Sequence, residues 1–113
     1  MALFRRKKTN EYDDASKSLN EANGLARDRV IFEQLENNDY RARELVFKLR
    51  EGCPLILSFE LLGQLDANKL VAFFTGATVA CDGQIVPIKE SVYLFARTID
   101  FKDGSLYELV NEI

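Results

Sequence analysis

The sequence feature that most constrains the fold is the run LILSF at residues 55–59, in which every residue except Ser58 is apolar. A strand that is apolar on both faces must be covered on both faces, so it belongs near the centre of a sheet. Segments with helical spacing of apolar residues lie on either side of this run. We predict one helix over residues 39–51 and a second that begins at Asp66 and stops at Gly76.

Strand patterns account for most of the remaining chain. We predict four further strands, over residues 30–36, 77–81, 84–88 and 92–97. Asp82-Gly83, between two of them, is a typical hairpin turn, and capping-box spacing at residues 105–108 predicts a short C-terminal helix. The resulting order, β-α-β-α-β-β-β, predicts an α/β two-layer sandwich with two main helices packed on a mixed sheet of about five strands.

Charge and apolar content divide the chain into three parts. Residues 1–8 form a basic tip, residues 9–29 have too few apolar side chains to pack and are expected to be a flexible linker, and residues 30–113 form the globular domain. Residues 1–29 carry seven basic and five acidic side chains, a net +2, whereas the rest carries eight and thirteen, a net −5. An acidic domain repels phosphate, so we expect no nucleic-acid partner.

Composition argues against most enzymatic chemistry. The chain has no histidine, which removes the commonest general base and the imidazole metal ligand. Cys53 and Cys81 are far apart in the sequence and lack metal-ligand spacing, so we interpret them as small, buried, unpaired residues. We therefore predict no catalytic residues, no metal site and no cofactor.

The basic tip combines apolar and cationic residues. Leu3 and Phe4 precede four consecutive cations, Arg5, Arg6, Lys7 and Lys8, a pattern that favours contact with an anionic membrane surface. The alternative is an unstructured, solubilising start. No apolar run reaches 18 residues and no signal-peptide pattern follows the start, so we expect a cytoplasmic protein that meets the membrane peripherally.

Both predicted helices carry aromatic residues away from their core-facing stripes. Phe73 and Lys69 share one flank of the second helix, a pair suited to an apolar, acidic peptide. Phe73 could instead pack beneath a neighbouring element. Tyr40 and Phe47 lie off the core stripe of the first helix, and such outer-flank aromatics favour a protein interface.

Several segments, in this order and spacing, resemble the SepF family of bacterial division proteins. They are GCPLIL at 52–57, LDANKLVAFFTG at 65–76, ATVACDGQI at 77–85 and VYL at 92–94. The sequence departs from the usual family pattern at Ser58-Phe59, at Lys69 and at Ala72. Its N-terminal membrane-binding stretch is also shorter than is usual.

The resemblance implies a non-enzymatic adaptor that binds the C-terminal tail of the division protein FtsZ, forms homodimers and polymers, and acts at the inner face of the cell membrane at the division site. It implies that the FtsZ peptide is contacted by Lys69, Phe73, Ala72 and Phe59. It also implies contacts between copies, for which we propose Gly76, Tyr40 and Phe47. FtsZ binding is the alternative role for the outer-flank aromatic residues.

Two other functions compete with this reading. A small α/β sandwich can be a regulatory domain that binds a metabolite at a dimer interface, which requires convergent polar groups and glycine loops at the strand ends. An RNA- or ribosome-associated module could use the basic tip and would lose binding at moderate salt.

Overall fold

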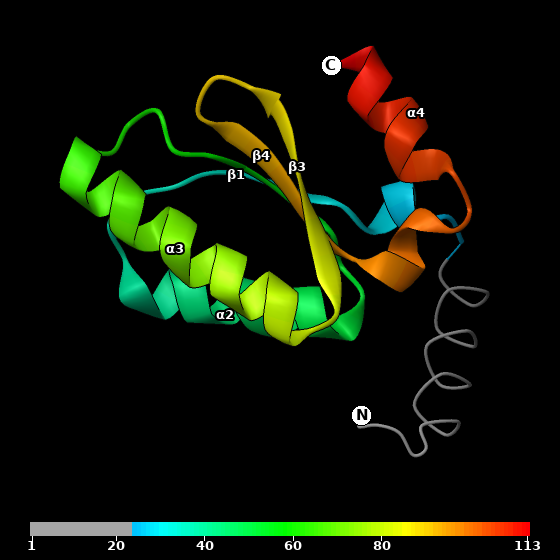
Figure 1. Ribbon diagram of the computed structural model, residues 1–113, viewed down its shortest axis with the longest axis horizontal. Helices are drawn as coiled ribbons and strands as arrows, with labels where there is room; N and C mark the ends of the chain where they lie inside the picture. Colours follow the sequence, from blue (N-terminus) through cyan, green and yellow to red (C-terminus); the bar gives the residue numbers. More distant parts are fainter. Residues whose placement is uncertain (1–23) are drawn as a thin grey trace.

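A computed structural model describes residues 24–113 of the chain. Its elements, in chain order, are η1 (Ala26–Arg29), β1 (Ile31–Gln34), α2 (Asp39–Glu51), β2 (Leu55–Ser58), α3 (Gln64–Ala80), β3 (Gly83–Lys89), β4 (Val92–Arg97), η2 (Thr98–Phe101) and α4 (Ser105–Glu112). Helices α2 and α3 lie side by side along one face of the sheet, and α4 lies apart from them near the C-terminus (Figure 1). The predicted α/β sandwich is confirmed.

The sheet has four strands in the order β1-β2-β4-β3. Strand β1 pairs with β2 in parallel, whereas β4 runs antiparallel to both β2 and β3. Strand β2 is therefore internal, as its apolar run predicts. Leu57 on one face is fully buried, and Ile56 on the other is only 5% exposed.

The main core lies between the sheet and helices α2 and α3. Helix α2 begins and ends where the sequence predicts: the Asn38 side chain accepts a hydrogen bond from the Arg41 amide, and Gly52 adopts the left-handed conformation at the C-terminal end. Leucines from α2 and β2 meet three aromatic rings, Phe59, Phe74 and Phe95, whose centroids lie 5.7–6.4 Å apart. This packing fixes both helices against the sheet.

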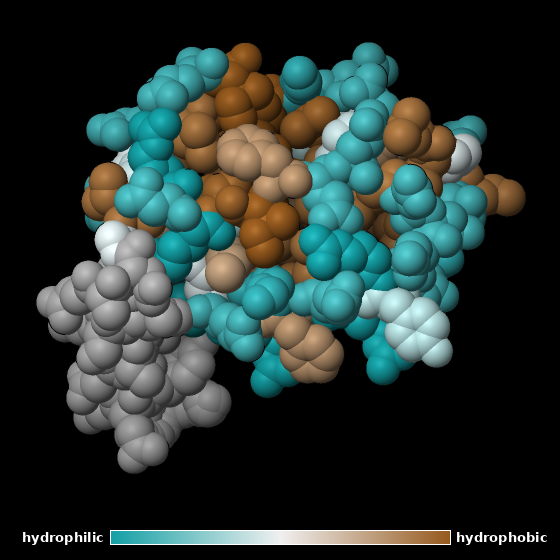
Figure 2. Space-filling model, turned by 180° about the vertical axis from the view of Figure 1, so that it is seen from behind, coloured by the Kyte–Doolittle hydropathy of each residue, from teal (hydrophilic) through white to brown (hydrophobic). Residues whose placement is uncertain are grey.

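The opposite face of the sheet is covered in part by η1, η2 and α4. Leu94 and Ala96 of β4 contact a second apolar cluster that includes Phe101 and Leu106. The predicted C-terminal helix is thus confirmed. From behind, apolar side chains gather in the middle of the molecule between hydrophilic margins (Figure 2).

The prediction of a strand over residues 77–81 was wrong, because α3 continues through Gly76 to Ala80. Thr78 is fully buried in the helix, and its hydroxyl donates a 2.6 Å hydrogen bond to the Phe74 carbonyl. The bond satisfies the buried hydroxyl, and the tertiary burial of Thr78 outweighs the strand preference of β-branched residues. The sheet consequently has four strands instead of five, and Gly76 does not end the helix.

The Asp82-Gly83 pair makes a different turn from the predicted hairpin. It connects α3 to β3, and Asp82 adopts a positive φ of 56°. A Cβ at Gly83 would lie 2.5 Å from the Ala96 carbonyl oxygen and 2.7 Å from Thr78 Cγ2. Glycine is therefore required here because α3 and β4 pass so close to the chain.

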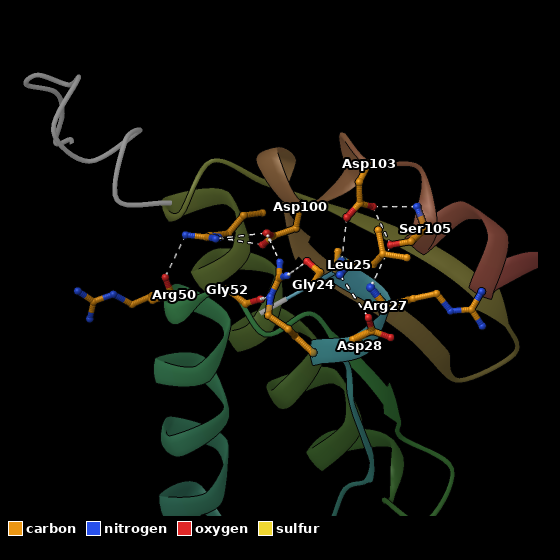
Figure 3. Close-up of polar contacts among 12 residues, drawn as sticks. Gly24, Leu25, Arg27, Asp28, Arg50, Gly52, Asp100, Asp103 and Ser105 are labelled. Atoms are coloured by element: carbon orange, nitrogen blue, oxygen red, sulfur yellow. Dashed lines mark hydrogen bonds and ion pairs between the residues drawn. The ribbon is translucent and has the colours of Figure 1, made fainter. Parts of the chain in front are cut away.

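A buried ionic network joins the start of the described chain to the end of β4 and to η2. Asp100 is 1% exposed and accepts hydrogen bonds from Arg97 and from Arg29 (Figure 3). The same arginines also bond to carbonyls at the end of α2: Arg29 Nε lies 2.8 Å from the Gly52 oxygen and Arg97 Nη1 lies 3.3 Å from the Arg50 oxygen. We call Arg29, Arg97 and Asp100 the buried triad.

The start of the described chain is held by further polar contacts. Residues 26–29, which the sequence pattern assigns to the linker, form η1 and pack against α4. The Ala26 amide donates to Asp103, and the Arg27 amide donates to the Ser105 hydroxyl (Figure 3). Ser105 is thus engaged with η1 and does not form the expected capping box.

Candidate protein-binding groove

A groove with a volume of about 320 Å³ lies between α2 and α3. The residues that line it are Asp39, Ala42 and Arg43 from α2 and Lys69, Leu70 and Phe73 from α3. Ala42 and Leu70 are buried and form an apolar floor. The groove therefore offers a partner an apolar surface with charged groups on both walls.

Helical spacing places these side chains on the groove. Lys69 and Phe73 are one turn apart on α3, and Asp39 and Arg43 have the same spacing on α2. Phe73 is 39% exposed. Its ring packs edge-on against buried Phe74, with centroids 5.3 Å apart and planes at 73°. The core thus holds Phe73 in place while part of its ring remains accessible.

The cations of the groove are held in different ways. Lys69 Nζ donates a 3.0 Å hydrogen bond to Asn37 Oδ1 and lies 3.4 Å from Asp39 Oδ1. The guanidinium of Arg43 lies over the ring of Tyr40, 5.9 Å from its centroid. Half of the Lys69 side chain is exposed to solvent. The groove therefore has one cation on each helix.

The structure brings two of the four predicted peptide contacts together in this groove. Lys69 and Phe73 both line it. Ala72 is exposed next to Phe73 but is not among the lining residues. Phe59 is 3% exposed and contacts Phe74, Tyr93 and Phe95, so it supports the helical layer from inside the core.

Sequence reasoning missed Asp39 and Arg43 as groove residues. Both lie one turn apart on the flank of α2 that faces α3, next to the core position Ala42. The helical periodicity of residues 39–51 contains this information. What the sequence lacks is the relative placement of the two helices, which decides which flank borders a groove.

The three residues predicted to contact other copies are all exposed on the helical layer. Tyr40 is 79% exposed and Phe47 is 56% exposed, and nothing lies within 4 Å of a Cβ built at Gly76. On α3, Ala72, Gly76 and Ala80 recur every fourth residue. Such small residues form a smooth strip that permits close approach of another helix.

Several further predictions concern chemistry or membranes. Cys53 and Cys81 are free and partly buried, and burial raises the pKa of both thiols. Within residues 24–113, no three His, Cys, Asp or Glu side chains are grouped to hold a metal ion, and no helix is long and apolar enough to cross a membrane. The predicted membrane-contacting residues lie outside the described residues; they are Leu3, Phe4, Arg5, Arg6, Lys7 and Lys8.

The fold and the groove define a two-layer α/β domain whose candidate site is a protein-binding surface on its helical layer. Residues 35–98, more than half of the chain, match the family described as "Cell division protein SepF". The chain belongs to the SepF family, a family of cell-division proteins, and the resemblance found in the sequence is confirmed.

Individual relatives agree with this membership. Cell division protein SepF of Lacticaseibacillus casei (strain BL23) is 29% identical over 82 residues, which cover 73% of this chain and 53% of the relative. The protein of the same name from Lactobacillus gasseri is 26% identical over 95 residues, covering 84% of this chain and 65% of the relative. The chain thus spans about half the length of the L. casei protein.

Proposed function

We propose that this chain is a cell-division adaptor that binds the C-terminal tail of FtsZ in the groove between α2 and α3. In this proposal the chain associates with further copies of itself and links FtsZ to the inner face of the cell membrane. The observation that carries it is the combination of an apolar floor with cations on both helices, in a chain of the SepF family.

The groove suits an extended or helical peptide that is both apolar and acidic. An apolar side chain of the peptide would cover Ala42, Leu70 and the accessible part of the Phe73 ring. A neighbouring carboxylate would meet Lys69 from one wall or Arg43 from the other. The domain carries a net charge of −5 over residues 30–113 and as a whole repels an acidic partner, so Lys69 and Arg43 supply the local positive charge that such a partner needs.

The proposal is non-enzymatic and depends on many copies acting together. One basic tip at residues 1–8 would hold the membrane weakly, but an assembly presents several tips at once and gains by effective concentration. The exposed strip around Gly76 and the aromatic side chains of Tyr40 and Phe47 supply surface for that assembly. No reaction is assigned to the chain.

The test is a titration of the full chain with an FtsZ C-terminal peptide, followed by calorimetry or fluorescence anisotropy. We expect binding by the wild type and strong loss in the double variant Lys69→Glu, Phe73→Ala. A matched control is Lys102→Glu, Tyr107→Ala, which makes the same charge change and removes a half-exposed aromatic ring outside the groove. If the wild type does not bind, the adaptor function is wrong. If the groove variant and the control bind alike, the peptide lies elsewhere.

A further inference from the structure

We infer that Asp39 competes with the carboxylate of an acidic partner for Lys69. Asp39 contacts Lys69 in the free protein and so lowers the affinity of the groove for that partner. This inference rests on the proposed function, because it assigns a specificity-determining residue to the same groove. It also defines the partner chemically, as a peptide that carries a carboxylate next to an apolar side chain.

The first argument is geometric. Asp39 is the first residue of α2, and its Oδ1 lies 3.4 Å from Lys69 Nζ on α3. Asn37, in the preceding turn, holds the same ammonium group at 3.0 Å. Lys69 is thereby drawn towards the turn between β1 and α2, at the end of the groove where α2 begins. A partner carboxylate that pairs with Lys69 must therefore share its ammonium group with Asp39 or displace Asp39 from it.

The second argument concerns burial. The side chain of Lys69 is 50% exposed and that of Asp39 is 75% exposed. Ion pairs that are this exposed contribute little to folding stability. A ligand that competes for Lys69 can therefore exchange with Asp39 at little cost to the fold. Asp39 is also the one acidic residue among the six described residues that line the groove.

The third argument is the sign of the charge. A peptide carboxylate in the groove is attracted by Lys69 and Arg43 but repelled by Asp39. Removing the Asp39 charge should strengthen binding in two ways, by freeing Lys69 and by removing repulsion. Asp39 also lies in the first turn of α2, where a carboxylate is favourable to the helix dipole. Tighter binding by a variant without this carboxylate cannot therefore be credited to a more stable helix.

The experiment compares Asp39→Asn with Glu51→Gln in the full chain, using the FtsZ C-terminal peptide as the probe. Glu51→Gln removes one negative charge from the opposite end of the same helix, outside the groove. We expect Asp39→Asn to bind about two- to fivefold more tightly at low salt, the range of an exposed ion pair, and Glu51→Gln to change little. The gain should shrink at about 0.5 M salt because the charges are screened.

Combining each variant with Lys69→Met separates competition for Lys69 from direct repulsion of the peptide by Asp39. If Asp39 acts mainly through Lys69, the gain from Asp39→Asn is largely lost in the Lys69→Met background. An equal gain in both backgrounds overturns competition for Lys69 and leaves simple repulsion. Wild-type binding with no gain in Asp39→Asn overturns the inference alone. Absence of peptide binding by every variant overturns the proposed function, and this inference with it.

Discussion

The carboxylate of Asp100 accepts two hydrogen bonds from the guanidinium of Arg97, three residues earlier in the chain, at 2.9 and 3.3 Å. Both side chains are almost completely buried, at 1% and 4% exposure. Arg29, close to the start of the described chain, makes a third contact to the same carboxylate at 3.0 Å. One buried carboxylate therefore contacts two buried guanidinium groups.

Asp100→Asn should be strongly destabilising. It removes the buried negative charge that both guanidinium groups contact, and removing one member of a buried ion pair costs about 3–5 kcal/mol. The midpoint of urea unfolding measures the effect. Glu112→Gln is a suitable control because it removes a solvent-exposed carboxylate bonded to Arg27, and we expect little change there. Equal unfolding midpoints for the two variants would contradict the importance of the buried triad.

The same substitution should have opposite effects at two glycines. Gly83→Ala places a Cβ against the backbone of β4, and overpacking of this kind costs about 1–3 kcal/mol. Gly76→Ala has open space around it within α3, so it should stabilise the helix by roughly 0.5–1 kcal/mol. Thermal unfolding at low protein concentration compares the two. A destabilised Gly76→Ala variant would show that this position is crowded.

Self-association should depend on the exposed strip of α3. Gly76→Glu adds bulk and charge to the strip, so we expect sedimentation to show a smaller assembly than for the wild type. Lys102→Glu adds negative charge outside α2 and α3 and should leave the assembly size unchanged. If Gly76→Glu sediments like the wild type, contacts between copies lie elsewhere on the molecule.

Membrane binding should be lost on deletion of residues 2–8. The four cations contribute about 1 kcal/mol each at an anionic surface, and insertion of Leu3 and Phe4 adds roughly 3–5 kcal/mol before ordering costs. Flotation with anionic vesicles should recover the full chain but not the deletion variant. Neutral vesicles provide the control, since they lack the charge that attracts the tip. Flotation of the deletion variant with anionic vesicles would place the membrane contact elsewhere in the chain.

The contribution of Asp103 to stability should disappear in acid. Partial burial opposes ionisation of Asp103, but hydrogen bonds from the Ser105 hydroxyl and from the Ala26 and Ser105 amides outweigh it, so its pKa lies below the ordinary value of 3.8. A carboxylate with a lowered folded-state pKa stabilises the fold above the unfolded-state pKa, and this stabilisation is lost as pH falls through the folded-state pKa.

The variant Asp103→Asn tests this. The variant should have a lower free energy of unfolding in urea than the wild type. This difference should be largest at neutral pH and should shrink steadily as the pH falls below about 4. A deficit of the same size at pH values around 3 and 7 would mean that the amide hydrogen bonds, and not the charge, account for the role of Asp103.

Local signals in the sequence predicted some elements well and others poorly. Helix α2 was predicted to the residue because Asn38 and Gly52 mark its ends with distinct capping chemistry. The end of α3 was missed because Gly76 resembles a helix stop and residues 77–81 favour a strand. Thr78 is buried against β3, and this tertiary contact, which local sequence preference does not register, keeps residues 77–80 helical.

The candidate site was only partly predictable for a similar reason. The spacing of Lys69 and Phe73 identifies one wall of the groove, because both lie on one helix. The other wall depends on how α2 packs beside α3, which the core around Phe74 and Leu45 determines. The role of η1 was also hidden, since its partners Asp103 and Ser105 lie more than 75 residues away.

The attachment of η1 to α4 has a mechanical consequence. The described chain begins at η1, whose Ala26 belongs to the apolar cluster on the sheet face opposite the groove. A pull between a membrane-held N-terminus and a partner in the groove would therefore cross the whole thickness of the sandwich. If the proposed function holds, this force would enter through the contacts of Ala26, Arg27 and Arg29, and the buried triad would have to resist it.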